Sequence, residues 1–223
     1  DINEITKESE LRQKGKIAEL ALGYQGGVKA LVSMGAYNMN LCESELIEIV
    51  RAFRSSNTNI VKLWNTVEKA FIEAVNNKSI VHIDKNISFI YEGNILFIKL
   101  PSGRRLSYIR PKIDYNNAFN KSIITYEGVD STTKKNTRLT TYGGKLVENI
   151  VQAIARDVLG EAMMNLRNKG FNIVMHVHDE IVLEVENGVS SVEKVCEIMC
   201  KENRYLKGLN LRADGFESNY YKK

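Results

Sequence analysis

The stretch FNIVMHVHDEIVLEV, residues 171–185, constrains the fold more than any other part of this 223-residue chain. Two apolar, β-branched runs flank the polar centre His178-Asp179-Glu180. This pattern predicts a β-hairpin that carries its charged residues at a tight turn. Two adjacent carboxylates repel each other unless a metal ion or a strong donor lies between them. One interpretation is therefore a cation site at the tip, and the other is a solvated acidic turn.

The composition is that of an ordinary globular protein, with 43% hydrophobic and 26% charged residues. The net charge of +4 permits nucleic-acid binding without requiring it. No apolar run approaches the roughly 20 residues of a membrane span, and the start has no signal-peptide pattern. The cysteines, Cys42, Cys196 and Cys200, form no metal-ligand set. Cys196 and Cys200 lie four apart on a predicted helix, which suits reduced thiols, so we expect a cytoplasmic protein.

Periodicity predicts helices before and after a β-rich middle section. Trp64 lies in the centre of an apolar helical stripe, which favours a core position over a base-stacking platform. Short alternating runs separated by turn residues predict a small antiparallel meander at about 79–110. The predicted helices start near Leu11 and span 44–57, 58–77, 145–169 and 189–203, and the predicted strands span 79–83, 87–91, 95–100 and 104–109.

A basic stripe lies on the first predicted helix. Arg12, Lys16, Leu20 and Tyr24 are spaced four apart and so follow one side of that helix. Arginine offers a planar fork for phosphate, and lysine offers a mobile charge that carries protons. The stripe is therefore a candidate phosphate-binding face, and the alternative is a solvated basic face.

Together these features resemble the DNA polymerase I family (family A). His178-Asp179-Glu180 within its Val/Ile-rich hairpin resembles motif C of that family, whose Asp is one of two carboxylates that hold the catalytic metals. The stripe resembles motif B on the fingers helix, matching at Arg12, Lys16 and Tyr24. It departs at Leu20, where the family usually has Phe or Tyr, and at Gln25, which intervenes before the glycines.

The resemblance extends over nearly the whole chain. In the family, a glutamine on the helix before motif C reaches the minor groove of newly formed base pairs, and Gln152 matches its position. The hydrogen-bond acceptors there are common to all correct pairs, so contact with them checks base-pair geometry without reading sequence. The segment 100–104, LPSGR, resembles compact, phage-like members of the family. The end, residues 209–223, resembles the closing strand of these polymerases.

For the nucleotide, the resemblance implies that Arg12 and Lys16 bind its triphosphate, with Lys16 as a candidate proton donor to the leaving pyrophosphate. Leu20 then lies beside the nucleotide sugar and Tyr24 near the templating base. The roles of Leu20 and Tyr24 rest on the resemblance to motif B, whereas the chemistry of arginine and lysine agrees with the triphosphate role of Arg12 and Lys16.

For the metals and the DNA, the resemblance implies two Mg²⁺ ions in the intact enzyme. Asp179 holds them together with a second Asp, Glu180 is an auxiliary carboxylate, and His178 braces the primer end. Arg138, Lys134 and Lys135, in the polar stretch 116–141, are candidate contacts to the DNA backbone, although a solvated loop suits the two lysines equally.

The expected fold is α+β. Residues 1–140 would form a fingers-like helical region with the β-meander insert, and residues 141–223 a partial palm of antiparallel strands backed by helices. The second metal-binding Asp of the family, in motif A, has no counterpart upstream of Arg12. The chain therefore resembles the C-terminal portion of a polymerase, expected to be inactive by itself and to expose a palm edge that favours self-association.

Two other classes remain open. A metal-dependent hydrolase could use His176, His178 and Asp179, since paired histidines on a strand suit zinc. Such sites usually contain further histidine ligands, and His82 is the one other histidine in the sequence. A non-catalytic nucleic-acid-binding module could use the same basic helix without chemistry. Zinc content would separate the first class from a polymerase.

Overall fold

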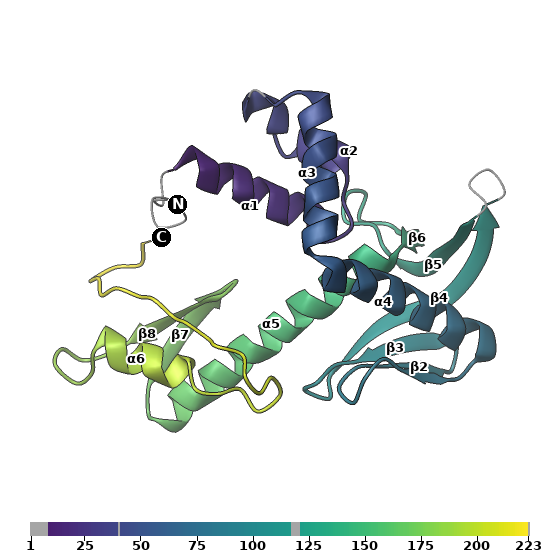
Figure 1. Cartoon of the computed structure of the whole chain (residues 1–223). Helices are drawn as coiled ribbons and strands as arrows, with labels where there is room; N and C mark the ends of the chain where they lie inside the picture. The colour runs from purple at the N-terminus through teal and green to yellow at the C-terminus, as the bar shows by residue number, and fades with distance from the viewer. Residues whose placement is uncertain (1–8, 40, 117–120, 223) are drawn as a thin grey trace. The chain divides into compact units, whose positions relative to one another are not determined.

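The computed structural model describes residues 9–39, 41–116 and 121–222, and it confirms an α+β fold (Figure 1). The helices are α1 (Glu10–Leu22), α2 (Val28–Ser33), the 3-10 helix η2 (Ala36–Met39), α3 (Glu43–Ser56), α4 (Thr58–Asn77), α5 (Gly143–Asn168) and α6 (Val192–Met199). The strands are β1 (Ile80–His82), β2 (Ser88–Glu92), β3 (Ile95–Lys99), β4 (Arg105–Asn116), β5 (Lys121–Val129), β6 (Asn136–Thr141), β7 (Asn172–Val177) and β8 (Glu180–Glu184).

The chain divides into two compact units. Unit 1 comprises residues 1–99 and 105–150, and unit 2 comprises residues 100–104 and 151–223. Helix α5 contributes its first eight residues to unit 1 and the rest to unit 2. None of the helices in the described residues is both long and apolar enough to cross a membrane.

A six-stranded antiparallel sheet in the order β1-β2-β3-β4-β5-β6 forms the β part of unit 1. The predicted meander is confirmed for its four strands, but the sheet continues through β5 and β6, in the stretch that the sequence left without defined strands. One face packs on α4 through Phe71, whose ring meets Phe89 edge-on at 6.3 Å and Tyr108 at 5.4 Å. These edge-on contacts between aromatic rings bury this face of the sheet against α4.

The helices of unit 1 form a second apolar cluster. Ala21 and Leu22 of α1 pack against residues of α2, η2 and α3, namely Leu31, Ala36 and Leu46. Glu45 completes a capping box at the start of α3 by accepting a 2.7 Å hydrogen bond from the Cys42 amide, which lowers the pKa of Glu45. Only Asn57 separates α3 from α4.

Trp64 is a core residue, as predicted, with only 2% of its surface exposed. Its indole nitrogen donates a 3.1 Å hydrogen bond to the carbonyl oxygen of Gly23, directly after α1. A buried indole N–H needs such a partner, and this one fixes the end of α1 against α4.

Unit 2 consists of most of α5, the β7–β8 hairpin, α6 and the chain that follows. The predicted long helix is confirmed, and Gly170 follows its end at a φ of +87°. Helix α6 spans Val192–Met199 and is therefore shorter than the predicted 189–203. Asn203 lies outside the helix, and its buried side-chain amide donates a hydrogen bond to Glu161 on α5. Cys196 and Cys200 are free thiols, as expected, and burial raises the pKa of Cys196.

The predicted closing strand is wrong for the described residues. Residues 201–222 contain neither helix nor strand. The segment contains three Asn and two Gly residues, types that are poorly represented in strands, and its backbone forms local turns, such as the 3.1 Å bond from the Leu209 amide to the Leu206 carbonyl.

The loop at residues 100–104 is anchored on α5 within unit 2. The carboxylate of Asp157 accepts hydrogen bonds from the Ser102 hydroxyl at 2.6 Å and from Nε of Arg104 at 2.7 Å. The Arg104 guanidinium also donates to the Ala153 carbonyl at 2.7 Å. The residues that the sequence marked as phage-like thus have a structural role in holding the β3–β4 connection.

Candidate functional site

The hairpin at the centre of the sequence pattern is present, with a two-residue turn. Val177 pairs with Glu180, so His178 and Asp179 form the turn and Glu180 is the first residue of β8. His178 has a φ of +52°, in the left-handed region that histidine enters more readily than most residues. The turn conformation therefore holds His178 and Asp179 at the tip of the ribbon.

Neither strand of this hairpin contains a buried residue. A shift in register between Ile173 and Met175 marks a β-bulge in β7. Alternation places His176 and Ile181 on one face, where the Arg156 guanidinium of α5 lies 3.3 Å from Nε2 of His176. The ribbon is thus an exposed element attached to α5 by few contacts.

The tip presents its polar side chains to solvent. His178, Asp179 and Glu180 are all exposed. Within the described residues, no group of three or more His, Cys, Asp or Glu side chains is arranged to hold a metal ion. Asp179 and Glu180 supply hard oxygen ligands, which suit Mg²⁺, an ion that binds through one or two carboxylates together with waters and substrate phosphates. The pair fits one side of such a site.

A hollow of about 610 Å³ lies in unit 2, away from these carboxylates. Its hairpin residues are at the ends of the strands remote from the turn, among them Asn172 and Glu184, which share a 3.2 Å hydrogen bond. The hairpin tip is not among its lining residues. The candidate metal ligands are therefore on a projecting tip, outside this hollow.

Helix α1 carries the predicted basic stripe on its solvent side. Arg12, Lys16 and Leu20 are exposed, and Tyr24, just after the helix, is half-buried. The apolar residues that pack into unit 1 come from the other positions, such as Ala21 and Leu22. Leu20 is an exposed leucine between Lys16 and Tyr24 of the stripe, so its side chain is available to a ligand.

Gln25, which departs from the family pattern, has a specific position at the start of α5. Its φ is +71°, and its side-chain oxygen accepts a 2.8 Å hydrogen bond from the Gly144 amide. Glu68 of α4 accepts a 2.8 Å hydrogen bond from the neighbouring Gly143 amide. Two side chains distant in sequence therefore satisfy amides at this helix start, where the backbone has no partners of its own.

Close packing at this point requires both glycines. A Cβ atom on Gly144 would lie 2.2 Å from the Tyr24 carbonyl oxygen, and one on Gly143 would lie 2.2 Å from the Trp64 carbonyl oxygen. The end of α1 is thus fixed to α4 and to the start of α5 within unit 1. In the sequence, Gln25 stood out only as a departure from the family pattern, and neither its contact with Gly144 nor that of Glu68 with Gly143 was predicted.

Gln152 is exposed on α5, in the part of that helix that belongs to unit 2. Asn149, three residues earlier, donates a 3.0 Å hydrogen bond to the Tyr108 hydroxyl and belongs to unit 1. The helix therefore presents an exposed amide at Gln152 and uses the nearby Asn149 for packing.

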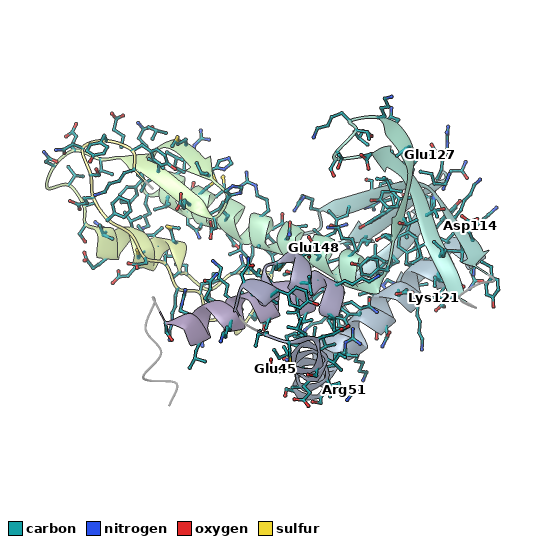
Figure 2. All side chains as sticks on the ribbon, turned by 90° about the horizontal axis from the view of Figure 1, so that it is seen from above. Glu45, Arg51, Asp114, Lys121, Glu127 and Glu148 are labelled. Carbon is teal, nitrogen blue, oxygen red and sulfur yellow. The ribbon has the colours of Figure 1, made fainter. Side chains whose placement is uncertain are left out.

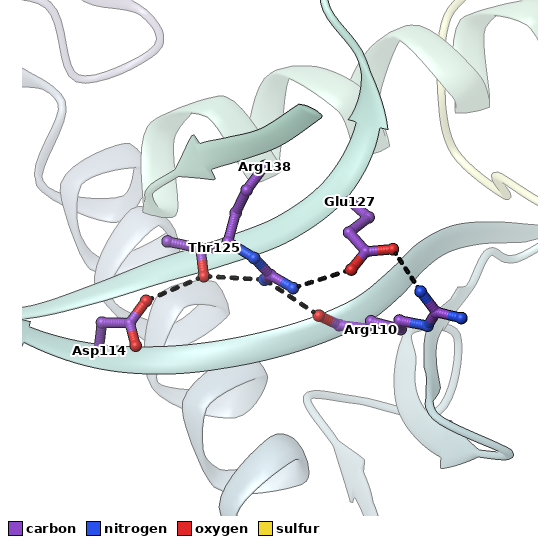
Figure 3. A network of polar contacts seen from close by, with 5 residues as sticks. All are labelled: Arg110, Asp114, Thr125, Glu127 and Arg138. Atoms are coloured by element: carbon purple, nitrogen blue, oxygen red, sulfur yellow. Dashed lines mark hydrogen bonds and ion pairs between the residues drawn. The ribbon is translucent and has the colours of Figure 1, made fainter. Parts of the chain in front are cut away.

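Arg138 is half-buried in a polar network on the six-stranded sheet (Figure 3). Its guanidinium donates to Thr125 Oγ1 at 3.1 Å and to the Arg110 carbonyl at 3.2 Å, and it forms a 3.2 Å ion pair with Glu127. These contacts hold the side chain along the sheet. Figure 2 shows Glu127, Asp114 and Lys121 on the strands of this sheet.

The predicted site residues thus divide between the two units. Arg12, Lys16, Leu20, Tyr24 and Arg138 belong to unit 1, whereas Gln152, His178, Asp179 and Glu180 belong to unit 2. Sequence reasoning identified each as a surface or ligand-facing position. It missed Gln25, Glu68 and Asp157, whose importance depends on distant hydrogen-bond partners.

Comparison with known proteins identifies one relevant similarity. A protein of Bacillus phage SP02 described as a DNA polymerase is 54% identical to the chain over 222 residues. The aligned region covers 100% of this chain and 34% of the phage protein, so the chain spans about a third of that relative's length. No protein-family model and no solved structure matches the chain.

Proposed function

We propose that the chain is part of a template-directed DNA polymerase that adds deoxynucleotides to the 3′ end of a primer. The observation that carries this proposal is the 54% identity, along the whole chain, with a phage protein described as a DNA polymerase. Its substrates would be primer–template DNA and deoxynucleoside triphosphates. Because the chain spans about a third of that relative, the activity is proposed for a protein of the relative's full length.

We place the chain within family A, in the C-terminal fingers and palm portion of the compact, phage-like subgroup. Three blocks in sequence order support this placement: the α1 stripe, Gln152 on α5, and the His178-Asp179-Glu180 tip. In these terms the helices and sheet of unit 1 correspond to fingers, and the β7–β8 hairpin with its helices corresponds to part of a palm.

The residues of α1 would act on the nucleotide. Arg12 binds triphosphate oxygens through its fork of donors, while Lys16 neutralises the leaving pyrophosphate and can donate a proton to it. Leu20 contacts the sugar through its exposed apolar side chain, and Tyr24 lies against the templating base. The fixed end of α1 supports this assignment, because phosphoryl transfer depends on positioning and electrostatics.

The hairpin tip would hold Mg²⁺ through Asp179, with Glu180 as an auxiliary ligand. When two such ions are bound, they lower the pKa of the primer hydroxyl and stabilise the charge on the transferred phosphate. Asp179 contributes the negative charge that keeps a divalent cation at this position, and its exposure leaves it open to a substrate phosphate. A further carboxylate is required to complete the site.

Contacts with DNA would come from three side chains. Gln152 would donate to minor-groove acceptors of the newest base pairs, and His178 would contact the primer end. Arg138 would contact the DNA backbone, although its three internal interactions limit its reach. We assign it a weaker role than the sequence suggested.

The alternative functions receive less support. A zinc hydrolase would use a ring nitrogen of His176, but the Arg156 guanidinium lies 3.3 Å from Nε2 of this ring and can only donate a hydrogen bond to it, which leaves Nδ1 for a metal. A non-catalytic nucleic-acid-binding module fits the same basic surfaces. It differs from a polymerase in making no use of Asp179.

Replacement of Asp179 tests the proposal. The experiment inserts the 223-residue segment into the phage SP02 polymerase in place of the matching third, then measures primer extension. Asp179→Asn keeps the shape and removes the charge that binds the metal, so nucleotide addition should fall on the order of 10³-fold while DNA affinity is unchanged. Asp214→Asn, at another exposed aspartate of unit 2, is the matched control.

Three outcomes would argue against the proposal. An inactive chimera with the unmodified segment would argue against a polymerase. Equal activity of Asp179→Asn and the control would remove Asp179 from the site. Loss of DNA binding without a specific loss of extension would favour the binding module.

A further inference from the structure

One face of strands β4, β5 and β6 carries most of their charged side chains, together with the aliphatic Ile109, Ile123 and Val129, and faces away from the aromatic core of unit 1. Cα pairing places Lys112 opposite Thr125, and Thr125 opposite Thr140, so these residues share a face. Glu127 and Arg138 pair on the same face. The opposite face carries Tyr126, whose ring meets that of Tyr108 at 5.0 Å in the core. We call the first surface the basic sheet face, formed by Arg110, Lys112, Arg138 and the turn lysines Lys134 and Lys135.

Positive charge is concentrated in this part of the chain. Residues 105–141 contain seven Lys and Arg residues and three Asp and Glu residues. The three acidic groups are all engaged locally. Glu127 forms ion pairs with both Arg110 and Arg138, at 3.0 and 3.2 Å, so one carboxylate serves two guanidinium groups.

The other two acids hold backbone or hydroxyl groups. Asp114 accepts a 3.1 Å hydrogen bond from the Thr125 hydroxyl (Figure 3). Asp130 accepts hydrogen bonds from the amides of Thr132 and Thr133, at 3.0 and 2.7 Å, and these bonds lower its pKa. The turn that carries the two lysines is therefore fixed by Asp130 from within.

The lysines of the basic sheet face have no such partners. Among the residues that the structure describes, the ammonium groups of Lys112, Lys134 and Lys135 form no ion pair, and all three side chains are exposed. Arg110 is also 68% exposed despite its ion pair. The face thus combines two arginines that share one carboxylate with exposed lysines that form no ion pair among the described residues.

We propose that the basic sheet face binds the sugar-phosphate backbone of double-stranded DNA, at a site separate from the α1 stripe and the hairpin tip. Charge complementarity carries the proposal, because a phosphate backbone supplies the dense negative charge that these cations lack. The face is a sheet whose arginines and lysines are spread over β4, β6 and the turn before β6, which suits an extended polyanion better than one small ligand.

The absence of stacking groups favours a duplex over a single strand. Residues of β4, β5 and β6 assigned to this face by pairing contain no aromatic side chain, and Phe97, on the same side of the adjacent β3, has the Arg105 guanidinium over its ring at 5.5 Å. Single-strand binding relies on aromatic side chains that stack on bases, whereas backbone contacts with duplex DNA need cations alone. Binding should therefore be independent of sequence and sensitive to salt.

This inference rests on the proposed function in one respect, because the proposed function is what identifies the bound polyanion as DNA. The test uses the 223-residue chain itself and a fluorescent duplex of about 20 base pairs, with affinity measured by anisotropy between about 50 and 200 mM salt. The variant replaces Lys112, Lys134 and Lys135 with alanine. The matched control replaces Lys62, Lys69 and Lys85, exposed lysines of α4 and the β1–β2 turn, and has the same net charge.

Raising the salt over this range should weaken DNA binding by both the unmodified chain and the triple variant. If all three lysines contact phosphates, the loss of affinity should be about 40-fold larger for the unmodified chain than for the variant. The control should retain the full salt dependence. Thermal unfolding of both variants should match that of the unmodified chain, which separates lost binding from lost folding.

The proposal fails if variant and control lose affinity equally, because total charge would then explain binding. It also fails if a single strand with equal phosphates competes better than the duplex, or if anionic phospholipid vesicles bind and DNA does not. A polymerase chimera without activity, alongside lysine-dependent duplex binding, would overturn the proposed function and leave this inference standing.

Discussion

Tyr108 is a buried phenol in the core between the six-stranded sheet and α4. Only 3% of its surface is exposed, and its ring lies edge-on to those of Phe71 and Tyr126. Burial raises the pKa of Tyr108 to about 12, although the hydrogen bond from Asn149 acts in the opposite direction. The charged form is therefore strongly disfavoured in the folded chain.

We predict a loss of stability at high pH that depends on Tyr108. Below about pH 10 the phenol is protonated in both states and contributes no pH dependence. Between about pH 10 and 12 the unfolded chain ionises first, so the free energy of unfolding falls as pH rises. The decrease due to this residue should be about 1.4 kcal/mol between about pH 9 and pH 11.

Urea unfolding followed by the fluorescence of Trp64, the single tryptophan, measures this effect. Tyr108→Phe is the comparison, because it removes the ionisable group and keeps the ring. The difference in free energy of unfolding between the unmodified chain and Tyr108→Phe should change by about 1.4 kcal/mol between about pH 9 and pH 11. A constant difference would show that Tyr108 ionises normally in the folded state.

At the scale of elements, the junction of α1, α4 and α5 determines how the candidate nucleotide helix is held. Trp64 and Gln25 make the side-chain bonds, and Gly143 and Gly144 allow the backbones to approach. Orphan amides at a helix start cost stability when they are buried without partners. The junction is therefore expected to tolerate little change in volume.

Two glycines of α5 allow a matched test of this junction. Gly144→Ala would place a Cβ 2.2 Å from the Tyr24 carbonyl oxygen, so we expect the free energy of unfolding to fall by about 2–4 kcal/mol. Gly160→Ala, in the same helix with no atom within 4 Å of its Cβ, should raise it by about 0.5–1 kcal/mol. Chemical denaturation measures both values.

Equal effects of the two substitutions would contradict the packing described at the start of α5. A loss confined to Gly144→Ala would support it. If nucleotide binding by the chimera also weakened in Gly144→Ala while the chain stayed folded, the junction would be shown to position α1 for its proposed ligand.

At the scale of the whole molecule, the chain holds the proposed nucleotide residues and the proposed metal residues in different compact units. The hairpin provides two adjacent carboxylates, and the described residues contain no cluster of three metal-binding side chains. Electrostatic catalysis of nucleotidyl transfer needs a fully assembled metal site. Self-association through the exposed hairpin also remains a prediction, to be measured by sedimentation.

We predict that the 223-residue chain by itself does not extend a primer. The measurement is extension at high protein concentration, with the Asp179→Asn chain as control and the active chimera as reference. Template-dependent extension by the unmodified chain, absent from the control, would show that Asp179 and Glu180 suffice and that the site needs no further carboxylate.

Local patterns in the sequence determined much of this protein. Apolar, β-branched runs around the polar centre His178-Asp179-Glu180 determined the β7–β8 hairpin, whereas strand pairing decided that Glu180 belongs to β8 and that the turn has two residues. Four-residue spacing determined the exposed stripe of α1, and the central place of Trp64 in an apolar row determined its burial. These features depend on neighbours in the chain, so periodicity alone is sufficient to predict them.

Tertiary structure decided the features that depend on distant partners. Gln25 and Glu68 meet amides 119 and 75 residues away, and no local pattern encodes such contacts. Strands β5 and β6 are polar on one face, and their pairing with β4 fixes them in the sheet. Residues 201–222 contain no strand. A strand there would need a neighbouring strand to pair with, and the two described sheets contain only β1–β6 and β7–β8.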